Sequence, residues 1–258
     1  PYAAGKVSDE SLGQALAMLN QIRYIAGLDA GVTLNDTYTQ MAQTGSMLNA
    51  ANNQLSHYPS RPSGMSDELY ELGYYVTSSS NIAMTSWRSS LLKSLMMWMD
   101  DSDSSNIDRL GHRRWILNPT MQQTGFGYAV SNSGAAYSSV YVFDYDYHNT
   151  DVTGVSWPAT EMPKRYFESS SAWSYSYGSS LNGNVSVKLQ CLTTGRERTW
   201  NFSSAASDGY FNVDNGGYGQ KGCVIFKPDS ISLQAGEDYE VTITQDGTVI
   251  ADYTVHFF

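Results

Sequence analysis

The sequence predicts an α+β protein in which a mainly helical half is followed by an all-β half. Apolar residues recur at helical spacing through the first hundred or so residues, whereas from Ala172 onward they alternate with a period near two. Turn signals such as Asn182-Gly183 and Asp246-Gly247 separate the alternating runs. Several short strands over roughly a hundred residues favour an immunoglobulin-like β-sandwich as the second domain.

The first half contains four segments with a helical pattern. Ser8 and Asn35 are residues of the types that cap helix N-termini. The predicted helices are the runs that begin at Ser8 and at Asn35, and residues 66–72 and 87–99. The last of these is apolar on most sides, which indicates a buried helix.

Strands are expected in both halves. In the first half they cover 123–130 and 137–146, after Pro119. In the second half they cover 172–177, 184–193, 197–202, 222–227, 238–244 and 248–257. Residues 151–163 hold turn residues and two prolines, and they are interpreted as a linker. The predicted domains are therefore 1–150 and 151–258.

The amino-acid composition limits the classes of partner that the protein can bind and indicates its cellular location. The formal net charge of -10 disfavours nucleic acid and anionic membranes, and it is compatible with cation binding or with solubility alone. No apolar run reaches the length of a transmembrane helix. The chain begins at Pro1 without a signal peptide, so we expect a processed or truncated form of an extracellular or cell-surface protein. Only 16% of residues are charged, and 19 are tyrosines, a composition that suits an extracellular protein.

The two cysteines are Cys191 and Cys223, each in a strand-like run. A disulfide that joins two strands is the expected arrangement, and it would stabilise the fold by about 3–4 kcal/mol. Two buried free thiols are the alternative. No pattern of a structural zinc site or of a redox motif is present.

Two histidines are the candidates for chemistry in the first half. His57 follows the second predicted helix, and His112 follows an acidic cluster of Asp100, Asp101, Asp103 and Asp108. Imidazoles and carboxylates suit a divalent cation such as zinc, and a histidine also suits acid–base chemistry near neutral pH. The third possibility is that both histidines are buried, hydrogen-bonded and structural.

A smaller candidate lies near the end of the first domain. Asp144, Asp146 and His148 alternate along one predicted strand, so their side chains share a face. A cation site and a solvated edge are both compatible with this pattern.

The first half contains an ordered series of short motifs. They are Leu19-Asn-Gln-Ile-Arg-Tyr-Ile-Ala-Gly-Leu28, Ala42 to Ala51, His57, Asn81-Ile-Ala83, Trp98, Gly111-His-Arg-Arg-Trp-Ile-Leu-Asn-Pro119 and Thr124-Gly-Phe-Gly-Tyr-Ala129. This series resembles the CAP superfamily, which includes cysteine-rich secretory proteins and bacterial SCP-like extracellular proteins. The resemblance covers about residues 8–150. The resemblance implies a three-layer α-β-α sandwich with a shallow cleft, located outside the cell. Val155-Ser-Trp-Pro158 to Pro163, with Trp173-Ser-Tyr-Ser176, is similar to the β-sandwich module that follows the CAP domain in some bacterial surface proteins.

The resemblance also implies a site. Members of the superfamily line the cleft with two histidines and two acidic residues, sometimes around a metal ion. His57 and His112 match the histidines, and Asp101, three residues after Trp98, matches the second acidic position. Ser80 stands at the first acidic position. Because a serine hydroxyl is a poor zinc ligand and no base at neutral pH, this departure weakens the expectation of catalysis and of tight metal binding.

Three functions follow from these residues. The first is a non-enzymatic binding module whose cleft holds a small molecule, a peptide, a cell-envelope ligand or a divalent cation. The second is a hydrolase, for example of peptides, that uses His57 or His112 as general base, with or without a metal. The third is a structural surface module. The second domain is expected to bind or to act as a spacer.

Overall fold

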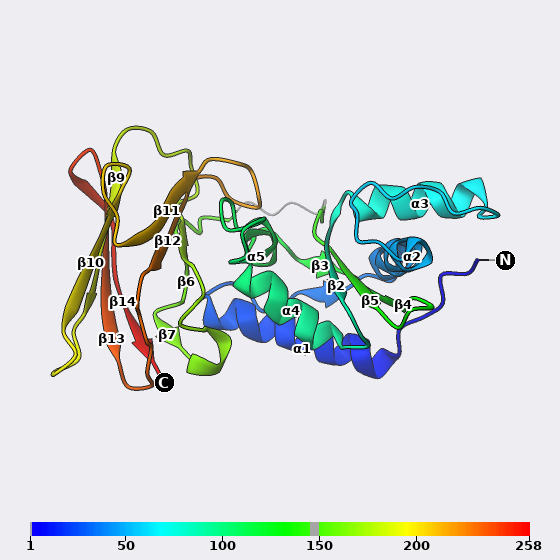
Figure 1. The fold of residues 1–258 in the computed structure, drawn as a ribbon, viewed down its shortest axis with the longest axis horizontal. Coiled ribbons are helices and arrows are strands. Elements are labelled where there is room, and N and C mark those ends of the chain that lie inside the picture. Colours follow the sequence, from blue (N-terminus) through cyan, green and yellow to red (C-terminus); the bar gives the residue numbers. More distant parts are fainter. Residues whose placement is uncertain (1, 145–149) are drawn as a thin grey trace. The chain divides into compact units, whose positions relative to one another are not determined.

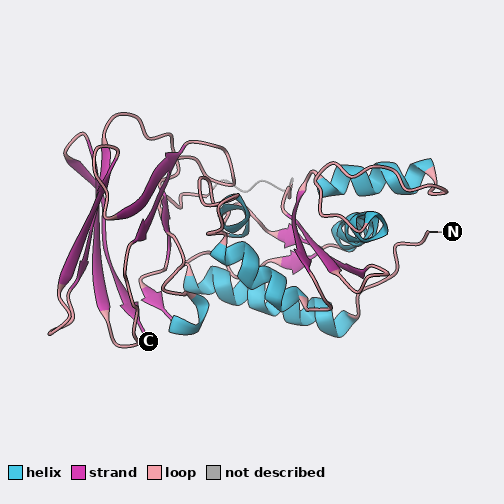
Figure 2. Cartoon of the chain, in the orientation of Figure 1, coloured by secondary structure: helices cyan, strands magenta, loops and turns pink. Residues whose placement is uncertain are grey.

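The computed structural model describes residues 2–144 and 150–258, and it divides into two compact units. The first unit comprises residues 1–22, 29–99 and 120–149, and the second comprises 23–28, 100–119 and 150–258. Figures 1 and 2 show that the first unit combines helices with a small sheet and that the second is mostly strands. The α+β class predicted from the sequence is confirmed.

The described residues of the first unit form four helices and two small sheets. The helices are α1 (Asp9–Ile25, of which the last turn belongs to the second unit), α2 (Asp36–Asn52), α3 (Asp67–Thr77) and α4 (Leu91–Asp100). The strands are β1 (Thr33–Leu34), β2 (Ser80–Thr85), β3 (Gln123–Thr124), β4 (Phe126–Val130) and β5 (Ala136–Tyr141). Strands β2, β5 and β4 form an antiparallel sheet in that order, and β1 pairs with β3 in parallel.

Two adjacent serines on the central strand β5 show the layers of this unit. Ser138 Oγ accepts a hydrogen bond from Ser94 of α4, and Ser139 Oγ accepts one from Ser46 of α2, both at 2.9 Å. Because neighbouring residues of a strand point to opposite faces, α4 and α2 must cover opposite faces of the sheet. The three-layer α-β-α arrangement that the resemblance implies is therefore present (Figure 1).

Helix α2 packs on the sheet at backbone distance. A Cβ at Gly125 would lie 2.2 Å from the Thr39 nitrogen, and one at Gly127 would lie 2.1 Å from the Ala42 oxygen. Both values are far below van der Waals contact, so only glycine fits at these two positions.

The predicted helix starts are largely confirmed. Asn35 Oδ1 accepts a hydrogen bond from the Tyr38 main-chain N–H at 3.1 Å, and Ser8 Oγ accepts one from Ser11 at 3.2 Å. Each bond satisfies one of the main-chain donors that a helix N-terminus leaves without an intrahelical partner.

The second unit is a β-sandwich with one short helix, α5 (Gly111–Ile116), and one 3₁₀ turn, Lys164–Tyr166. Its strands are β6 (Val155–Trp157), β7 (Glu161–Met162), β8 (Trp173–Ser176), β9 (Val185–Cys191), β10 (Arg198–Ser203), β11 (Gly209–Asp214), β12 (Cys223–Pro228), β13 (Asp238–Gln245) and β14 (Thr248–Phe257). One sheet has the order β10-β9-β13-β14-β7 and the other β11-β12-β8-β6.

Aromatic side chains from both sheets meet in the core of the sandwich. The ring of Trp173 on β8 lies 5.8 Å from those of Phe226 on β12 and Tyr239 on β13, and 5.9 Å from that of Phe257 on β14. Trp173 itself is fully buried. Large buried aromatic rings of this kind dominate the apolar burial of a core.

The predicted Cys191–Cys223 disulfide is wrong. Both thiols are free and buried. Cys191 ends β9 in the five-stranded sheet, whereas Cys223 begins β12 in the four-stranded sheet. Two packed sheets can be joined by a disulfide only where two cysteines face each other directly, and strand-like sequence patterns do not specify which positions do so. Burial raises the pKa of the Cys223 thiol.

Residues 100–119 belong to the second unit, although the sequence division at residue 150 assigned them to the first domain. Ile107 and Leu110 of this segment pack against Ala172, Cys223 and Ile225 of the sandwich. The CAP-like segment therefore shares a hydrophobic cluster with the β-sandwich, and the domain boundary at residue 150 stays a prediction. Among the described residues, every helix is too short or too polar to cross a bilayer.

Candidate functional site

Asp101 and His112 form a buried carboxylate–imidazole pair in the second unit. Asp101 Oδ1 lies 2.7 Å from His112 Nδ1, and Asp101 Oδ2 accepts a hydrogen bond from the His112 main-chain N–H at 2.9 Å. The Asp101 side chain is 2% exposed and that of His112 is 20% exposed. Asp101 adopts a left-handed conformation with φ 49°, which turns the carboxylate toward the start of α5.

The pair fixes the orientation of the imidazole. An ionised carboxylate only accepts hydrogen bonds, so His112 Nδ1 carries the hydrogen and Nε2 is the basic nitrogen of the neutral ring. A histidine oriented in this way by a carboxylate is found in metal sites and in acid–base sites. The same carboxylate caps α5, whose N-cap residue Leu110 supplies no side-chain hydrogen bond.

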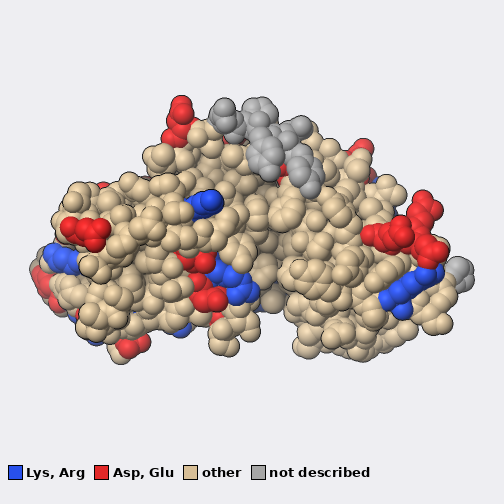
Figure 3. Space-filling model, turned by 90° about the horizontal axis from the view of Figure 1, so that it is seen from above, with Lys and Arg blue, Asp and Glu red and all other residues tan. Residues whose placement is uncertain are grey.

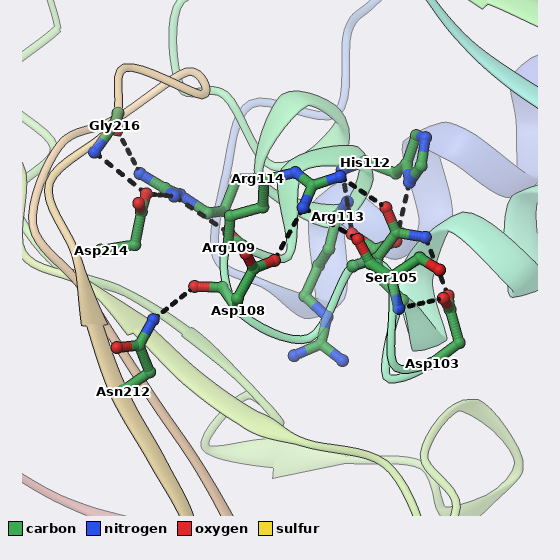
Figure 4. A network of polar contacts seen from close by, with 12 residues as sticks. Asp103, Ser105, Asp108, Arg109, His112, Arg113, Arg114, Asn212, Asp214 and Gly216 are labelled. Carbon is green, nitrogen blue, oxygen red and sulfur yellow. Dashed lines mark hydrogen bonds and ion pairs between the residues drawn. The ribbon is translucent and has the colours of Figure 1, made fainter. Parts of the chain in front are cut away.

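Two adjacent arginines anchor α5 to the sandwich (Figure 4). Arg113 is fully buried, and its guanidinium donates to the oxygens of Asp100 (2.6 Å), Ala172 (2.7 Å) and Ser174 (3.0 Å). Burial lowers the pKa of Arg113 to about 10, against the opposing effect of Asp101 and Asp100, so the group stays charged at neutral pH.

Arg114 extends the network in Figure 4 to the loop after β11. Its guanidinium donates to Asp214 Oδ2 and to the Gly216 oxygen, both at 2.5 Å, and to the Gln220 oxygen at 2.6 Å. The ring of Tyr218 lies 5.2 Å from the guanidinium carbon in a cation–π contact.

Arg23 completes the support at the other end of the helix. It is fully buried, and it donates to the main-chain oxygens of Ile116 (3.0 Å) and Asn118 (2.8 Å). A cation at the C-terminus of a helix satisfies carbonyls that lack intrahelical partners. Helix α5 is thus held at its start by Asp101, along its body by Arg113 and Arg114, and at its end by Arg23.

His57 lies in the first unit, between α2 and α3. Its Nδ1 is 2.5 Å from the Thr77 carbonyl oxygen, and the Thr77 hydroxyl donates to the His57 carbonyl at 3.0 Å. A carbonyl only accepts, so Nδ1 carries the hydrogen here as well. The residue itself is exposed.

Ser80 opens β2 in the same unit. The residue is 6% exposed, and its hydroxyl oxygen is buried without a hydrogen-bond partner in the structure. A buried hydroxyl in this state is uncommon, since burial without a partner costs about 1–3 kcal/mol.

The structure brings two of the four predicted site residues together, Asp101 and His112. His57 and Ser80 belong to the first unit and the other two to the second, so the cleft that they share by resemblance stays a prediction. Sequence analysis missed Arg113, Arg114 and Arg23. The sequence did contain a signal for the two arginines of α5, because they are adjacent within the apolar segment 111–119. Buried guanidinium groups require hydrogen-bond acceptors, so this position indicates a structural role.

The other acidic positions have local roles. The Asp103 carboxylate accepts hydrogen bonds from the Ser105 main-chain N–H and the Asn106 side-chain amide, both in its own turn. Asp144 accepts from the Gln122 and Gln123 main chains at 3.0 and 2.8 Å, which fixes the start of β3. Asp146 and His148 lie outside the described residues. Within the described ranges, no group of three or more histidine, cysteine or acidic side chains is gathered closely enough to hold a metal ion.

The fold and these motifs define a CAP domain joined to a β-sandwich. The sequence profile of the family described as CAP, cysteine-rich secretory protein family, matches residues 16–145, which is half of the chain. The chain therefore belongs to the CAP family. A comparison with curated protein sequences found no match. Among solved structures, an outer surface protein from Borrelia burgdorferi is similar over 53% of this chain and 94% of its own length, at 14% identity and a TM-score of 0.35.

Proposed function

We propose that the chain is an extracellular binding protein in which the imidazole of His112 is the polar centre of the ligand site. Family membership supports a secreted location, and the surface is consistent with it. The face drawn in Figure 3 carries few and scattered charged side chains, as expected for a chain with 16% charged residues.

The observation that carries the proposal is the Asp101–His112 pair. A buried carboxylate holds the ring through Nδ1, and the ring keeps a partly exposed edge. That arrangement suits a divalent cation or a hydrogen-bond donor of a small ligand, because a carboxylate on Nδ1 fixes the ring orientation and makes Nε2 its basic nitrogen.

A zinc titration tests the cation form of this proposal. If His112 contributes a zinc ligand, millimolar zinc should raise the melting temperature by mass action. At a zinc concentration a hundredfold above Kd, the free energy of unfolding increases by about 2.7 kcal/mol. Metal binding requires a neutral imidazole, so the shift should weaken as the solution is acidified. His112→Ala should abolish the shift.

His256 offers a matched control. It forms the same pair with Asp238, also at 2.7 Å, but its side chain is 39% exposed and that of Asp238 is 48% exposed. His256→Ala should leave the zinc response unchanged. A melting temperature that does not respond to zinc at neutral pH, or one that responds equally in both variants, excludes the cation form.

The second candidate function is that of a hydrolase, and it is also supported by the Asp101–His112 pair. A histidine oriented by a buried carboxylate is the arrangement of a general base. Screening a peptide library for cleavage by the parent protein and by His112→Ala distinguishes the two functions. Turnover that His112→Ala abolishes would replace the binding proposal.

A further inference from the structure

Strand β11 is an end strand with a row of outward-facing main-chain groups. Among the strands that the structure describes it pairs with β12 alone, and the Asp229 N–H donates to the Asp208 oxygen at the start of the ladder. In an antiparallel pair, alternate residues direct their main-chain groups to the partner. Tyr210, Asn212 and Asp214 therefore bond β12, and Gly209, Phe211 and Val213 direct their N–H and C=O groups away from it.

The apolar interior of the sandwich opens beside this edge. All six residues of β11 are only half-buried, whereas those of β12 are nearly all buried. Phe211 lies opposite Phe226, whose ring packs on Trp173 in the core, so Phe211 and Val213 face the interior. Their incomplete burial means that the core lacks a cover along β11.

A groove of about 670 Å³ occupies this position. Its walls are β11, residues 203–207 from the end of β10 to β11, and three residues of the segment 181–185 that leads into β9. The lining side chains are a mixture of apolar and uncharged polar groups, and none is charged.

Two exposed aspartates stand at the rim. Asp208 directly precedes β11, and Asp246 accepts a hydrogen bond from the Asn184 main chain at 2.9 Å. Neither belongs to an ion pair among the described residues. Asp208 Oδ2 accepts a hydrogen bond from the Asn201 main-chain N–H at 2.7 Å, so its charge is hydrogen-bonded and not neutralised by a cation. An uncharged groove between these two carboxylates is complementary to a segment with an uncharged centre and basic ends.

Proteins normally protect such an edge. Proline, lysine, inward-pointing charge or a bulge prevents another strand from pairing with it. The sequence of β11, Gly-Tyr-Phe-Asn-Val-Asp, has no proline and no lysine, and its register with β12 has no bulge. The edge is therefore competent to accept a further strand.

We propose that β11 and its groove bind an extended peptide segment with basic flanks, which adds a fifth strand to the four-stranded sheet. The peptide main chain bonds the outward groups of Gly209, Phe211 and Val213. Its inward side chains cover Phe211 and Val213, and its basic ends lie near Asp208 and Asp246. Strand addition of this kind obtains affinity from main-chain hydrogen bonds and specificity from alternate side chains.

The test uses the whole chain and a labelled probe peptide of alternating valine and threonine with lysine at both ends. Fluorescence anisotropy measures binding, and amide hydrogen exchange locates it. We expect saturable binding, with slower exchange of the Phe211 and Val213 amides. The same peptide with glutamate at both ends should bind several-fold more weakly.

Two variants separate edge pairing from other contacts. Val213→Pro removes an outward N–H without removing a bond to β12, and proline is tolerated at such edge positions. It should weaken peptide binding at least about tenfold. Val213→Thr changes the side chain and keeps the N–H, so it should bind more tightly than Val213→Pro. Protection of the β12 amides in each variant verifies that the sheet is intact.

A further variant tests the rim. Asp208→Asn with Asp246→Asn removes both charges and keeps an oxygen acceptor at each position. It should weaken binding of the lysine-ended peptide several-fold and remove the preference over the glutamate-ended peptide. Absence of saturable binding, or binding that Val213→Pro leaves unchanged, would overturn the proposal. So would protection of the β11 amides that rises with chain concentration in the absence of peptide, because the occupant would then be a second copy of this chain.

Discussion

Gly127 shows how a single residue determines the distance between layers in the first unit. A methyl group there would lie 2.1 Å from the oxygen and 2.3 Å from the carbon of the Ala42 carbonyl. These are main-chain atoms of α2, which cannot rotate away as a side chain can. Gly127→Ala must therefore displace α2 from β4, and we expect a loss of about 2–4 kcal/mol in the free energy of unfolding.

Gly13 is the matched control for this prediction. It lies on the exposed side of α1, and nothing stands within 4 Å of a Cβ built there. Gly13→Ala should stabilise the protein by about 0.5–1 kcal/mol, because alanine is the better helix former. Urea denaturation of the two variants measures both effects, and equal stabilities would contradict close packing of α2 on β4.

The sequence predicted some site residues and missed others for a physical reason. Asp101 and His112 are eleven positions apart, within one motif-bearing segment, and both were predicted. Two acceptors of Arg113 lie 59 and 61 positions later, and one acceptor of Arg114 lies 100 positions later. Side-chain contacts at such separations leave no local periodicity. The error at Cys191 and Cys223 has the same origin, because a strand pattern does not specify the sheet to which the strand belongs.

At the scale of elements, strands of the sandwich were the most predictable. The expected runs 184–193, 238–244 and 248–257 correspond to β9, β13 and β14. Helix α5 was not predicted, since six residues are too few to show helical periodicity. Strand β11 was missed because its six residues lie among turn-forming residues.

Helix α5 is so short that its stability must come from its supports. Asp101→Ala removes the acceptor of the His112 N–H and places alanine in a left-handed conformation. We expect a loss of about 2–3 kcal/mol, since a cap contributes about 1–2 kcal/mol and a left-handed alanine costs about 1 kcal/mol. Thermal unfolding monitored by circular dichroism measures the change.

Asp108→Ala provides the comparison at this scale. Its side chain is 62% exposed and pairs with Arg109 on the surface. Such pairs contribute little, so this variant should remain within about 0.5 kcal/mol of the parent. If Asp101→Ala proved equally mild, the carboxylate would not be the support of α5 that its hydrogen bonds indicate.

At the scale of the whole molecule, the two units alternate along the chain. Residues 23–28 and 100–119 belong to the second unit although family resemblance places them in the CAP domain. Local sequence patterns do not reveal this, because the apolar partners of Ile107 and Leu110 begin at Ala172. The segment 111–115 therefore has two roles. It carries the candidate imidazole of His112, and it supplies the arginines that bond the sandwich.

This interleaving predicts how fragments behave. Chain cleavage between Asp151 and Val152, at an inserted protease site, should leave the protein folded, because it breaks no contact of residues 100–119 with β8 and β12.

The isolated fragment 1–151 keeps residues 100–119 but loses Ala172, Ser174 and Asp214, which accept hydrogen bonds from Arg113 and Arg114. Its buried guanidinium groups then lack acceptors, and Ile107 and Leu110 lose their apolar partners, so amide exchange across 100–119 should become fast. Mixing 1–151 with 152–258 should restore the slow exchange of the cleaved chain. Full protection of 100–119 in isolated 1–151 would instead mean that this segment folds within the CAP domain and that the contacts with the sandwich are secondary.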